Sequence, residues 1–549
     1  MPGASSPLGV DLISKGFANV VKREAIQKGI PDNILSSRYY PNGILTFYNH
    51  MMMTAAEMLI RYGYDTPKSK GMMVSIFGRI LDDPDLMSYA KELAKDDPEQ
   101  SIIAKIHQQW KDYWYLFTFD FGLDKAKKKI HNYHLDFLKL KTAKETFTAI
   151  MNACSDFDDA LAFHLAASTS SSDWNMIMFN ILCEAKGSFD IDVYSDFARL
   201  LATSSDVESA NVPQAMQEVA IQIVKDIGKE KFNSMSVEEA SEWLQTTSAS
   251  SGYKFRQFLK RHGHRCLKEF DVRSITWEMD PKLLVKLLQN MAGVTKEESS
   301  NKDDSINNIF SELNVPLNFK SKCLLKFVLP NCRRGVRTRE ATKSLCIKSF
   351  DHWRKGVRCL GKQMASEGRL PDEELIFFLT LDEISDLLNT RSPTIISRAN
   401  YRRRIFPTLE NYKFPEIMKG IPKPINDEEE SADTYEFIAD LTMKGTPVSV
   451  GVTKGYARVA ISLEEASHLQ PGEILITYST DIGWSPYFPI VSGVVTELGG
   501  LISHGAVVSR EYGLPCVVGL QGATKKFHTG DYVLLDGKKG ILQRLPKPE

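Results

Sequence analysis

Apolar residues recur at three- and four-residue intervals from residue 12 to about residue 418. This spacing is typical of amphipathic helices that pack on a common core. The clearest segments are 48–62, 86–95, 101–117 and 144–153. Clusters of small polar or charged residues interrupt the pattern, and they lie at 168–172, 246–251 and 296–304. We therefore expect one large, mostly helical domain over residues 1–424, and a division into two lobes near residues 245–310 remains open.

The pattern changes after Ile421-Pro422-Lys423-Pro424, where two prolines stop the helices. An acidic stretch at 426–433 predicts a solvated linker over residues 425–444, and a compact α/β domain follows over 445–549. In this domain we expect strands at 448–452 and 456–461, joined by a turn at 453–455, and further strands at 474–477, 491–498 and 530–537. A short helix is predicted at 463–469, and a second begins with Ser485 as N-cap and Pro486 as first residue. The expected fold is multidomain α and α/β.

Composition excludes several classes of protein. The 549 residues suffice for two to four domains, and 43% hydrophobic with 25% charged residues is ordinary for a globular chain. A net charge of −1 gives no electrostatic reason to expect nucleic acid or an anionic membrane as partner. The N-terminus carries no signal peptide, and no run approaches eighteen apolar residues. We expect a cytoplasmic protein.

Neither cysteines nor histidines form a metal-binding pattern. The eight cysteines are scattered without a Cys-x-x-Cys pair, which predicts reduced thiols. His262 and His264 stand two residues apart, but no further ligands accompany them. No metal site is predicted.

The most informative stretch surrounds His504. Apolar residues 491–498 predict a buried strand, Gly499 and Gly500 permit a sharp turn, and 506–512 predicts a helix closed by Gly513. The turn thus delivers His504 to a helix N-terminus, whose free N–H groups and positive dipole end suit an anion. A single histidine at a glycine turn is nevertheless more often structural than catalytic.

The whole string resembles a known site. Gly-Gly-x-x-Ser-His-Gly-Ala-Val-Val-Ser-Arg-Glu-Tyr-Gly-Leu-Pro-Cys-Val-Val-Gly, from Gly499 on, is similar to the phosphohistidine site in the swivelling domain of phosphoenolpyruvate-utilising enzymes. The likeness is greatest to the branch with rifampicin phosphotransferase and phosphoenolpyruvate synthase-like proteins. It implies that His504 carries a phosphoryl group, which Gly499, Gly500, Ser503 and Gly505 help to position. Ile502 stands where many pyruvate-phosphate dikinases have threonine, so regulation through that threonine is not expected.

A second candidate site lies on the helix predicted over 339–367. Its buried stripe runs through Cys346, Phe350, Trp353, Val357, Leu360 and Met364. Extended backwards, this stripe reaches Lys343 and Arg339, so two cations face inward near a helix N-terminus and need a partner. A carboxylate such as Glu269 or Asp271 is one solution, and a transferred phosphate is the other. In the phosphotransferases that the chain resembles, an Arg-Glu-x-x-Lys motif like Arg339 to Lys343 is implicated in handling that phosphate.

Two further strings resemble the helical substrate domain of these enzymes. They are Gly263-His264-Arg265, followed by Glu269, Asp271, Trp277 and Pro281, and the segment Phe377 to Glu383. Arg265 and Glu269 are candidate substrate-site residues, although a salt bridge between them at i, i+4 explains them equally well. For Arg510 we expect a salt bridge first and a phosphate ligand second. For other prominent residues we expect structural roles: a solvated helix face for Arg402 to Arg404, and core packing for Trp484 and Met51 to Met53.

The resemblance implies a transferase in which His504 passes a phosphoryl group from an ATP-grasp site to a hydroxyl-bearing small molecule. ATP and Mg²⁺ are implied as cofactors, but no Gly-rich nucleotide loop is present. We therefore expect the chain to lack an ATP-grasp domain and to use one from a longer architecture or in trans. A non-catalytic binding or scaffold protein, or an inactive fragment, is the alternative. The residues do not identify the acceptor, and neither rifampicin nor pyruvate is inferred.

Overall fold

The computed structural model describes residues 3–27, 44–54, 137–188, 191–201, 208–293, 306–414, 418–425, 441–501 and 503–548, with a few single residues between 85 and 110. Several predicted features lie wholly or largely outside these residues. They are the helices at 86–95 and 101–117, the break at 296–304 and the acidic stretch at 426–433.

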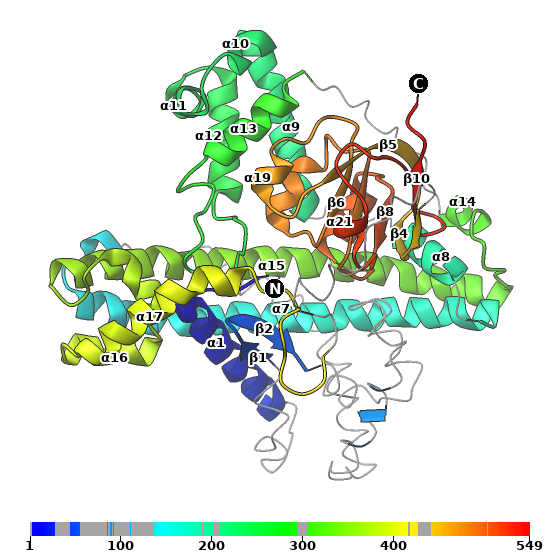
Figure 1. The fold of residues 1–549 in the computed structure, drawn as a ribbon. Coiled ribbons are helices and arrows are strands. Elements are labelled where there is room, and N and C mark those ends of the chain that lie inside the picture. Colours follow the sequence, from blue (N-terminus) through cyan, green and yellow to red (C-terminus); the bar gives the residue numbers. More distant parts are fainter. Residues whose placement is uncertain are drawn as a thin grey trace.

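Two long helices, α7 (Ala143–Lys186) and α15 (Phe319–Ser366), lie side by side through the middle of the molecule (Figure 1). They are antiparallel, since Phe157 of α7 stacks near Trp353 of α15, whereas Trp174 lies near Phe327. α7 begins with a capping box between Thr142 and Glu145 and ends at a left-handed Gly187. The predicted helices at 144–153 and 339–367 are therefore confirmed as parts of these two longer ones.

The predicted break at 168–172 is wrong, because these residues lie inside α7. Their small side chains serve helix packing instead. Gly335 of α15 approaches so closely that a Cβ there would lie 3.0 Å from the Cα of Ser171. Small polar residues thus let the two helices approach here, and they do not end α7.

One side of this helix pair is covered by α1 (Pro7–Gln27) and a β-hairpin (Figure 1). The hairpin pairs β1 (Ile44–Phe47) with β2 (His50–Met53), so the helix predicted over 48–62 is wrong in its described part. Tyr48 and Asn49 both have positive φ, at 51° and 60°, which suits a two-residue hairpin turn. Met51 packs against the core, as expected. The same core includes η2 (Phe137–Lys139), η3 (Glu373–Phe378), α16 (Leu381–Asn389) and α17 (Pro393–Glu410).

Shorter helices lie within residues 191–311. α11 ends at Thr246 and α12 begins at Ser250, which confirms the predicted break at 246–251. The helices of this group are α8 (Ile191–Leu201), α9 (Glu208–Ile227), α10 (Lys229–Asn233), α11 (Val237–Thr246), α12 (Ser250–His262), α13 (Lys282–Met291) and α14 (Ile306–Ser311).

The C-terminal region contains a mixed eight-stranded sheet with the order β3-β10-β9-β5-β6-β7-β8-β4. β5, β6, β7 and β8 are parallel to one another, and the other neighbours are antiparallel. The expected α and α/β fold is confirmed. The strands are β3 (Thr442–Lys444), β4 (Thr446–Ser449), β5 (Val452–Val459), β6 (Ile474–Thr477), β7 (Gly493–Thr496), β8 (Cys516–Val518), β9 (Tyr532–Asp536) and β10 (Ile541–Leu545).

Two local predictions in this region are wrong. The turn expected at 453–455 belongs to β5, which pairs with β9 over these residues, and the chain turns earlier at Gly451. Ser485 does not cap a helix but lies inside the 3-10 helix η4 (Ile482–Tyr487), whose N-cap Asp481 accepts from the Gly483 N–H at 2.9 Å. The remaining short helices are α19 (Leu463–Ala466), α20 (His504–Glu511) and α21 (Ala523–Lys526).

The sheet region lies directly on the helices, and one continuous hydrophobic core joins them. It contains Phe258 and Leu288 of the helices together with Trp484 and Val508 of the sheet region. β3 begins three residues before the predicted start of the α/β domain, and the domain boundaries themselves stay a prediction. In the part of the chain that the structure describes, no helix is long and apolar enough to cross a membrane.

Candidate functional site

His504 is the first residue of α20, and it follows Ser503 as N-cap. The strand β7, the glycine turn and α20 succeed one another as predicted. α20 faces the long helix α15, where Val507 packs against Val336. The histidine turn is thus docked on the helical part of the chain, one turn from the Arg339 to Lys343 motif.

The imidazole of His504 is held by a serine that the sequence did not identify. Ser485 Oγ, fully buried in η4, lies 2.9 Å from His504 Nε2. The other ring nitrogen, Nδ1, is buried without a hydrogen-bond partner in the described structure. Ser485 therefore orients the ring.

Close packing explains the glycines of the turn. Gly499 has a φ of 143°, which L-residues with a side chain rarely adopt. A Cβ on Gly505 would lie 2.4 Å from Thr480 Oγ1, so any larger residue would require the Thr480 side chain or α20 to move. Gly500 accepts a hydrogen bond from the Ser503 N–H at 3.0 Å. Phosphate positioning by Gly499, Gly500, Ser503 and Gly505 stays a prediction.

Charged side chains of α15 surround the docked histidine. Arg339 Nη2 donates to Glu340 Oε1 at 2.6 Å, and Lys343 Nζ lies 3.8 Å from Glu269 Oε2. Burial alone would raise the pKa of Glu340, but Arg339 and Lys343 outweigh it and hold that pKa well below its usual range. The two predicted cations are therefore brought together at His504.

A loop after α12 supplies the remaining charges. Arg265 Nη1 donates to Glu269 Oε1 at 2.9 Å, and both side chains are buried. The predicted pair is present, although its residues lie in a turn and not in a helix. Glu269 thus bridges Arg265 and Lys343. Asp271 is not part of this site, because its carboxylate accepts from Ser6 and Arg273 instead.

Asp481, at the start of η4, brings a further carboxylate to the same place. Burial and the nearby Glu269 raise the pKa of Asp481 to about 6. Its Oδ2 accepts from the Lys268 N–H at 3.4 Å, which links the sheet region to the loop carrying Glu269.

Charges of both signs lie around the histidine. Arg265, Arg339 and Lys343 are cations, whereas Glu269, Glu340 and Asp481 are carboxylates. Because the pKa of Asp481 is about 6, this carboxylate is mostly ionised at neutral pH and balances the third cation. A dianionic phosphoryl group on His504 would be attracted by the three cations, because ion pairs in a partly dry site are weakly screened.

The same surroundings keep His504 neutral. Burial lowers the pKa of His504 to about 3, and the positive charge of Lys343 acts in the same direction. Glu340 opposes the shift without reversing it. A neutral imidazole keeps the lone pair that a phosphoryl acceptor needs.

We expect acid to destabilise the protein through His504. Below its ordinary pKa of 6.5 the unfolded chain binds a proton at this residue, and the folded chain excludes that proton until about pH 3. Stability from this group is present above pH 6.5 and is lost as pH falls. Urea midpoints at about pH 7.5 and pH 5 should therefore fall more for the wild type than for His504→Gln. Equal shifts in the two proteins would contradict this assignment.

Arg510 hydrogen-bonds to the backbone beside the His504 turn. This buried side chain donates to the carbonyls of Leu501, at 2.6 Å, and Val448, at 3.2 Å, and burial lowers its pKa to about 10. The expected salt bridge is thus replaced by hydrogen bonds to backbone oxygens. Arg510 supports the turn that carries His504.

Other residues considered in the sequence have structural surroundings. His262 Nε2 lies 3.1 Å from Asn211 Oδ1, and Trp484 belongs to the core. Arg402 and Arg403 are not simply solvated, since they pair with Glu383 and Asp372. None of the eight cysteines forms a disulfide bond in the described structure.

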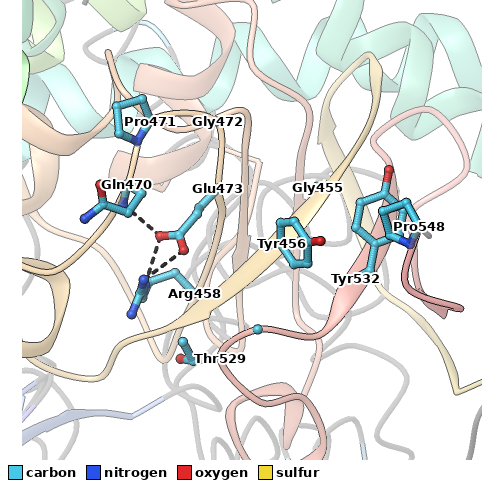
Figure 2. A pocket seen from close by; sticks show the side chains of 11 residues that line it. Gly455, Tyr456, Arg458, Gln470, Pro471, Gly472, Glu473, Thr529, Tyr532 and Pro548 are labelled. Atoms are coloured by element: carbon cyan, nitrogen blue, oxygen red, sulfur yellow. Dashed lines mark hydrogen bonds and ion pairs between the residues drawn. The ribbon is translucent and has the colours of Figure 1, made fainter.

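An open hollow of about 570 Å³ lies elsewhere, on the sheet beside β5 and β6. Figure 2 shows its charged pair, in which Arg458 donates to both oxygens of Glu473 at 2.9 and 2.8 Å. These charges satisfy each other, and neither His504 nor Lys343 lines the hollow. It is therefore no part of the candidate site.

Sequence reasoning missed Ser485, Asp481 and Glu340. Glu340 stands inside the Arg-Glu-x-x-Lys motif, so its position beside Arg339 was a usable signal. The Ser485-Pro486 pattern predicted only a helix N-cap, and no local pattern marked Asp481. The importance of both residues depends on the approach of η4 to α20 and to the loop at Lys268.

Two family models match the chain. Residues 164–340 match the fourth domain of rifampicin phosphotransferase, and residues 469–540 match the mobile domain of phosphoenolpyruvate-utilising enzymes. The first match ends within the Arg339 to Lys343 motif, and the second includes His504. The resemblance predicted from the residue strings is confirmed.

Curated relatives agree with these matches. The rifampicin phosphotransferases of Streptomyces sviceus and Bacillus cereus are each 30% identical over 302 residues, which is 52% of this chain and 34% of the relative. The phosphoenolpyruvate synthase of Aeropyrum pernix is 41% identical over 104 residues, or 19% of this chain and 13% of the relative. The chain thus spans about a third of the length of the rifampicin phosphotransferases that it matches.

Proposed function

Because its two matched regions correspond to the fourth domain of rifampicin phosphotransferase and to the mobile domain of phosphoenolpyruvate-utilising enzymes, we propose that the chain is part of a phosphotransferase. In this function His504 accepts a phosphoryl group that originates from ATP. It then passes the group to a hydroxyl-bearing small molecule bound by the helical region. We assign the acceptor to no narrower class than hydroxyl-bearing small molecules.

The observation that carries the proposal is the docking of His504 among Lys343, Arg339 and Arg265. A neutral, oriented imidazole is a suitable phosphoryl carrier. Phosphoryl transfer needs little covalent chemistry from the protein beyond positioning and charge stabilisation. The cations supply that stabilisation, while Ser485 and the close packing at Gly505 supply the positioning.

Among the described residues, no group of three or more His, Cys, Asp and Glu side chains could hold a metal ion. The resemblance implies ATP and Mg²⁺ as cofactors, and we assign both to an ATP-grasp domain, supplied either by a longer chain or in trans. The present site would then receive the phosphoryl group only through His504.

Labelling of His504 tests the function. The chain is incubated with Mg²⁺ and [β-³²P]ATP, with and without the ATP-grasp domain of a rifampicin phosphotransferase. We expect an acid-labile, alkali-stable label on the wild type that requires the added domain. His504→Ala should carry no label, because the nucleophile is gone.

His468→Ala is the matched control, since it removes an exposed histidine of the same region. It should be labelled like the wild type. Equal labelling of His504→Ala would refute the carrier role. Absence of label from the wild type under all conditions would instead favour a binding or scaffold protein.

A further inference from the structure

A second histidine belongs to the charged site, and it comes from the other long helix. His164 of α7 is half-buried, and its Nδ1 lies 3.3 Å from Thr342 Oγ1 of α15. Thr342 stands between Arg339 and Lys343, so the ring reaches the middle of the motif. The electrostatic neighbours of His164 are Lys343, Arg339 and Glu340, the same three groups that surround His504.

The hydrogen bonds indicate which nitrogen of His164 carries the proton. Thr342 has a single hydroxyl proton, and its Oγ1 lies 2.9 Å from the carbonyls of Thr338 and Arg339, which accept that proton. The proton shared with His164 must then come from Nδ1, and Nε2 holds the lone pair. A backbone hydrogen bond to Arg339 also holds the ring, and the side-chain hydrogen bond of His164 in the described structure uses Nδ1. Nε2 is not among the buried polar atoms without partners. Nε2 is therefore open to a ligand.

We propose that His164 is the general base that takes the proton from the acceptor hydroxyl during phosphoryl transfer from His504. This inference rests on the proposed function. Thr342 holds the ring with its unprotonated nitrogen exposed, while Lys343 and Arg339 lie beside both histidines. An acceptor bound between α7 and the docked α20 meets charge stabilisation and a base in one place.

Phosphoryl transfer exchanges one bond to phosphorus for another. The acceptor oxygen bonds to phosphorus as the N–P bond of phosphorylated His504 breaks, and the electron pair of that bond returns to the imidazole. The hydroxyl proton moves to His164 Nε2. His164 then releases a proton, and His504 takes one up, so both rings end neutral.

Charge explains why the base would act only when the carrier is loaded. Burial and the positive charges of Lys343 and Arg339 together lower the pKa of His164 to about 4, against the opposing effect of Glu340. His164 is thus neutral but weakly basic in the unloaded site. The negative charge of an arriving phosphoryl group raises the pKa of a nearby imidazole. His164 becomes a stronger base when phosphorylated His504 docks.

The test charges His504 chemically, so that no ATP-grasp domain is needed. The full chain is phosphorylated with phosphoramidate, and intact mass follows the loss of the phosphoryl group to water and to added glycerol as a probe alcohol. We expect His164→Ala to be charged like the wild type but to transfer about 10²-fold more slowly, since a general base contributes about 10²–10⁴. Added imidazole should restore part of the rate to His164→Ala.

A second variant separates catalysis from structure. His164→Asn keeps an amide donor for Thr342 but has no base, so it should also be slow, while His468→Ala should match the wild type. Wild-type transfer rates in both His164 variants would overturn the inference and leave the carrier role intact. Normal transfer by His164→Asn with a slow His164→Ala that imidazole does not rescue would overturn it as well. Failure of the wild type to be charged at His504 would refute the proposed function itself.

Discussion

Lys343→Met is expected to slow phosphoryl transfer from His504 by about 10²–10³. Removing one fixed donor to developing charge has effects of this size in other enzymes. Lys343 lies 3.8 Å from Glu269, too far for a hydrogen bond, so its ammonium remains available to a phosphoryl group. The measurement is the loss of phosphate from chemically charged protein to glycerol. Charging itself should fall much less, because His504 and Ser485 are unchanged.

Two further variants serve as controls for the Lys343→Met result. Lys326→Met makes the same chemical change at an exposed position of α15, and transfer should remain at the wild-type rate. Lys343→Arg keeps the charge and should retain more activity than Lys343→Met. If Lys326→Met and Lys343→Met were equally active, the role of Lys343 would be wrong.

Arg354→Leu is expected to destabilise the protein by about 3 kcal/mol, the lower end of the range for breaking a buried ion pair. The Arg354 side chain is fully buried, and its Nη1 donates to Asp351 Oδ1 at 3.0 Å. Its Nη2 donates to the backbone carbonyl of Glu269 at 2.6 Å. Lys355 still pairs with Asp351 in the variant, which limits the loss. Urea unfolding measures the change.

Arg403→Leu is the matched control. Arg403 pairs with Asp372 at 2.8 Å, but both side chains are about 40% exposed, so the loss should stay below about 1 kcal/mol. Because Arg354 holds the backbone beside Glu269, its loss should also slow phosphoryl transfer. An Arg354→Leu protein as stable as Arg403→Leu would show that the buried pair contributes little.

The site has two halves, the turn that carries His504 and the Arg339 to Lys343 motif of α15. The sequence pattern alone determined the local structure of each half. The apolar run before the glycine pair correctly predicted the strand, and the amphipathic segment after it correctly predicted the helix that carries His504. Both predictions succeeded because a strand and a short helix depend mainly on nearby residues. The stripe through Cys346, Phe350 and Trp353 placed Lys343 and Arg339 on one face of a helix, and both lie at the charged site. The sequence pattern gave a wrong prediction at 168–172. Small polar residues there are compatible both with a break between helices and with close packing of two helices.

Only the tertiary structure decided how these halves meet. His164 and Thr342 are 178 positions apart, and no spacing rule relates them until α7 and α15 pack antiparallel. Ser485 reaches His504 because β6 and β7 are parallel neighbours, which bring η4 and the glycine turn to the same edge of the sheet. The charges at His504 likewise come from three separate elements, which are α15, the loop after α12 and η4. Charge and hydrogen-bond partners act through space, so the sequence predicted the residues of the carrier while the fold determined their environment.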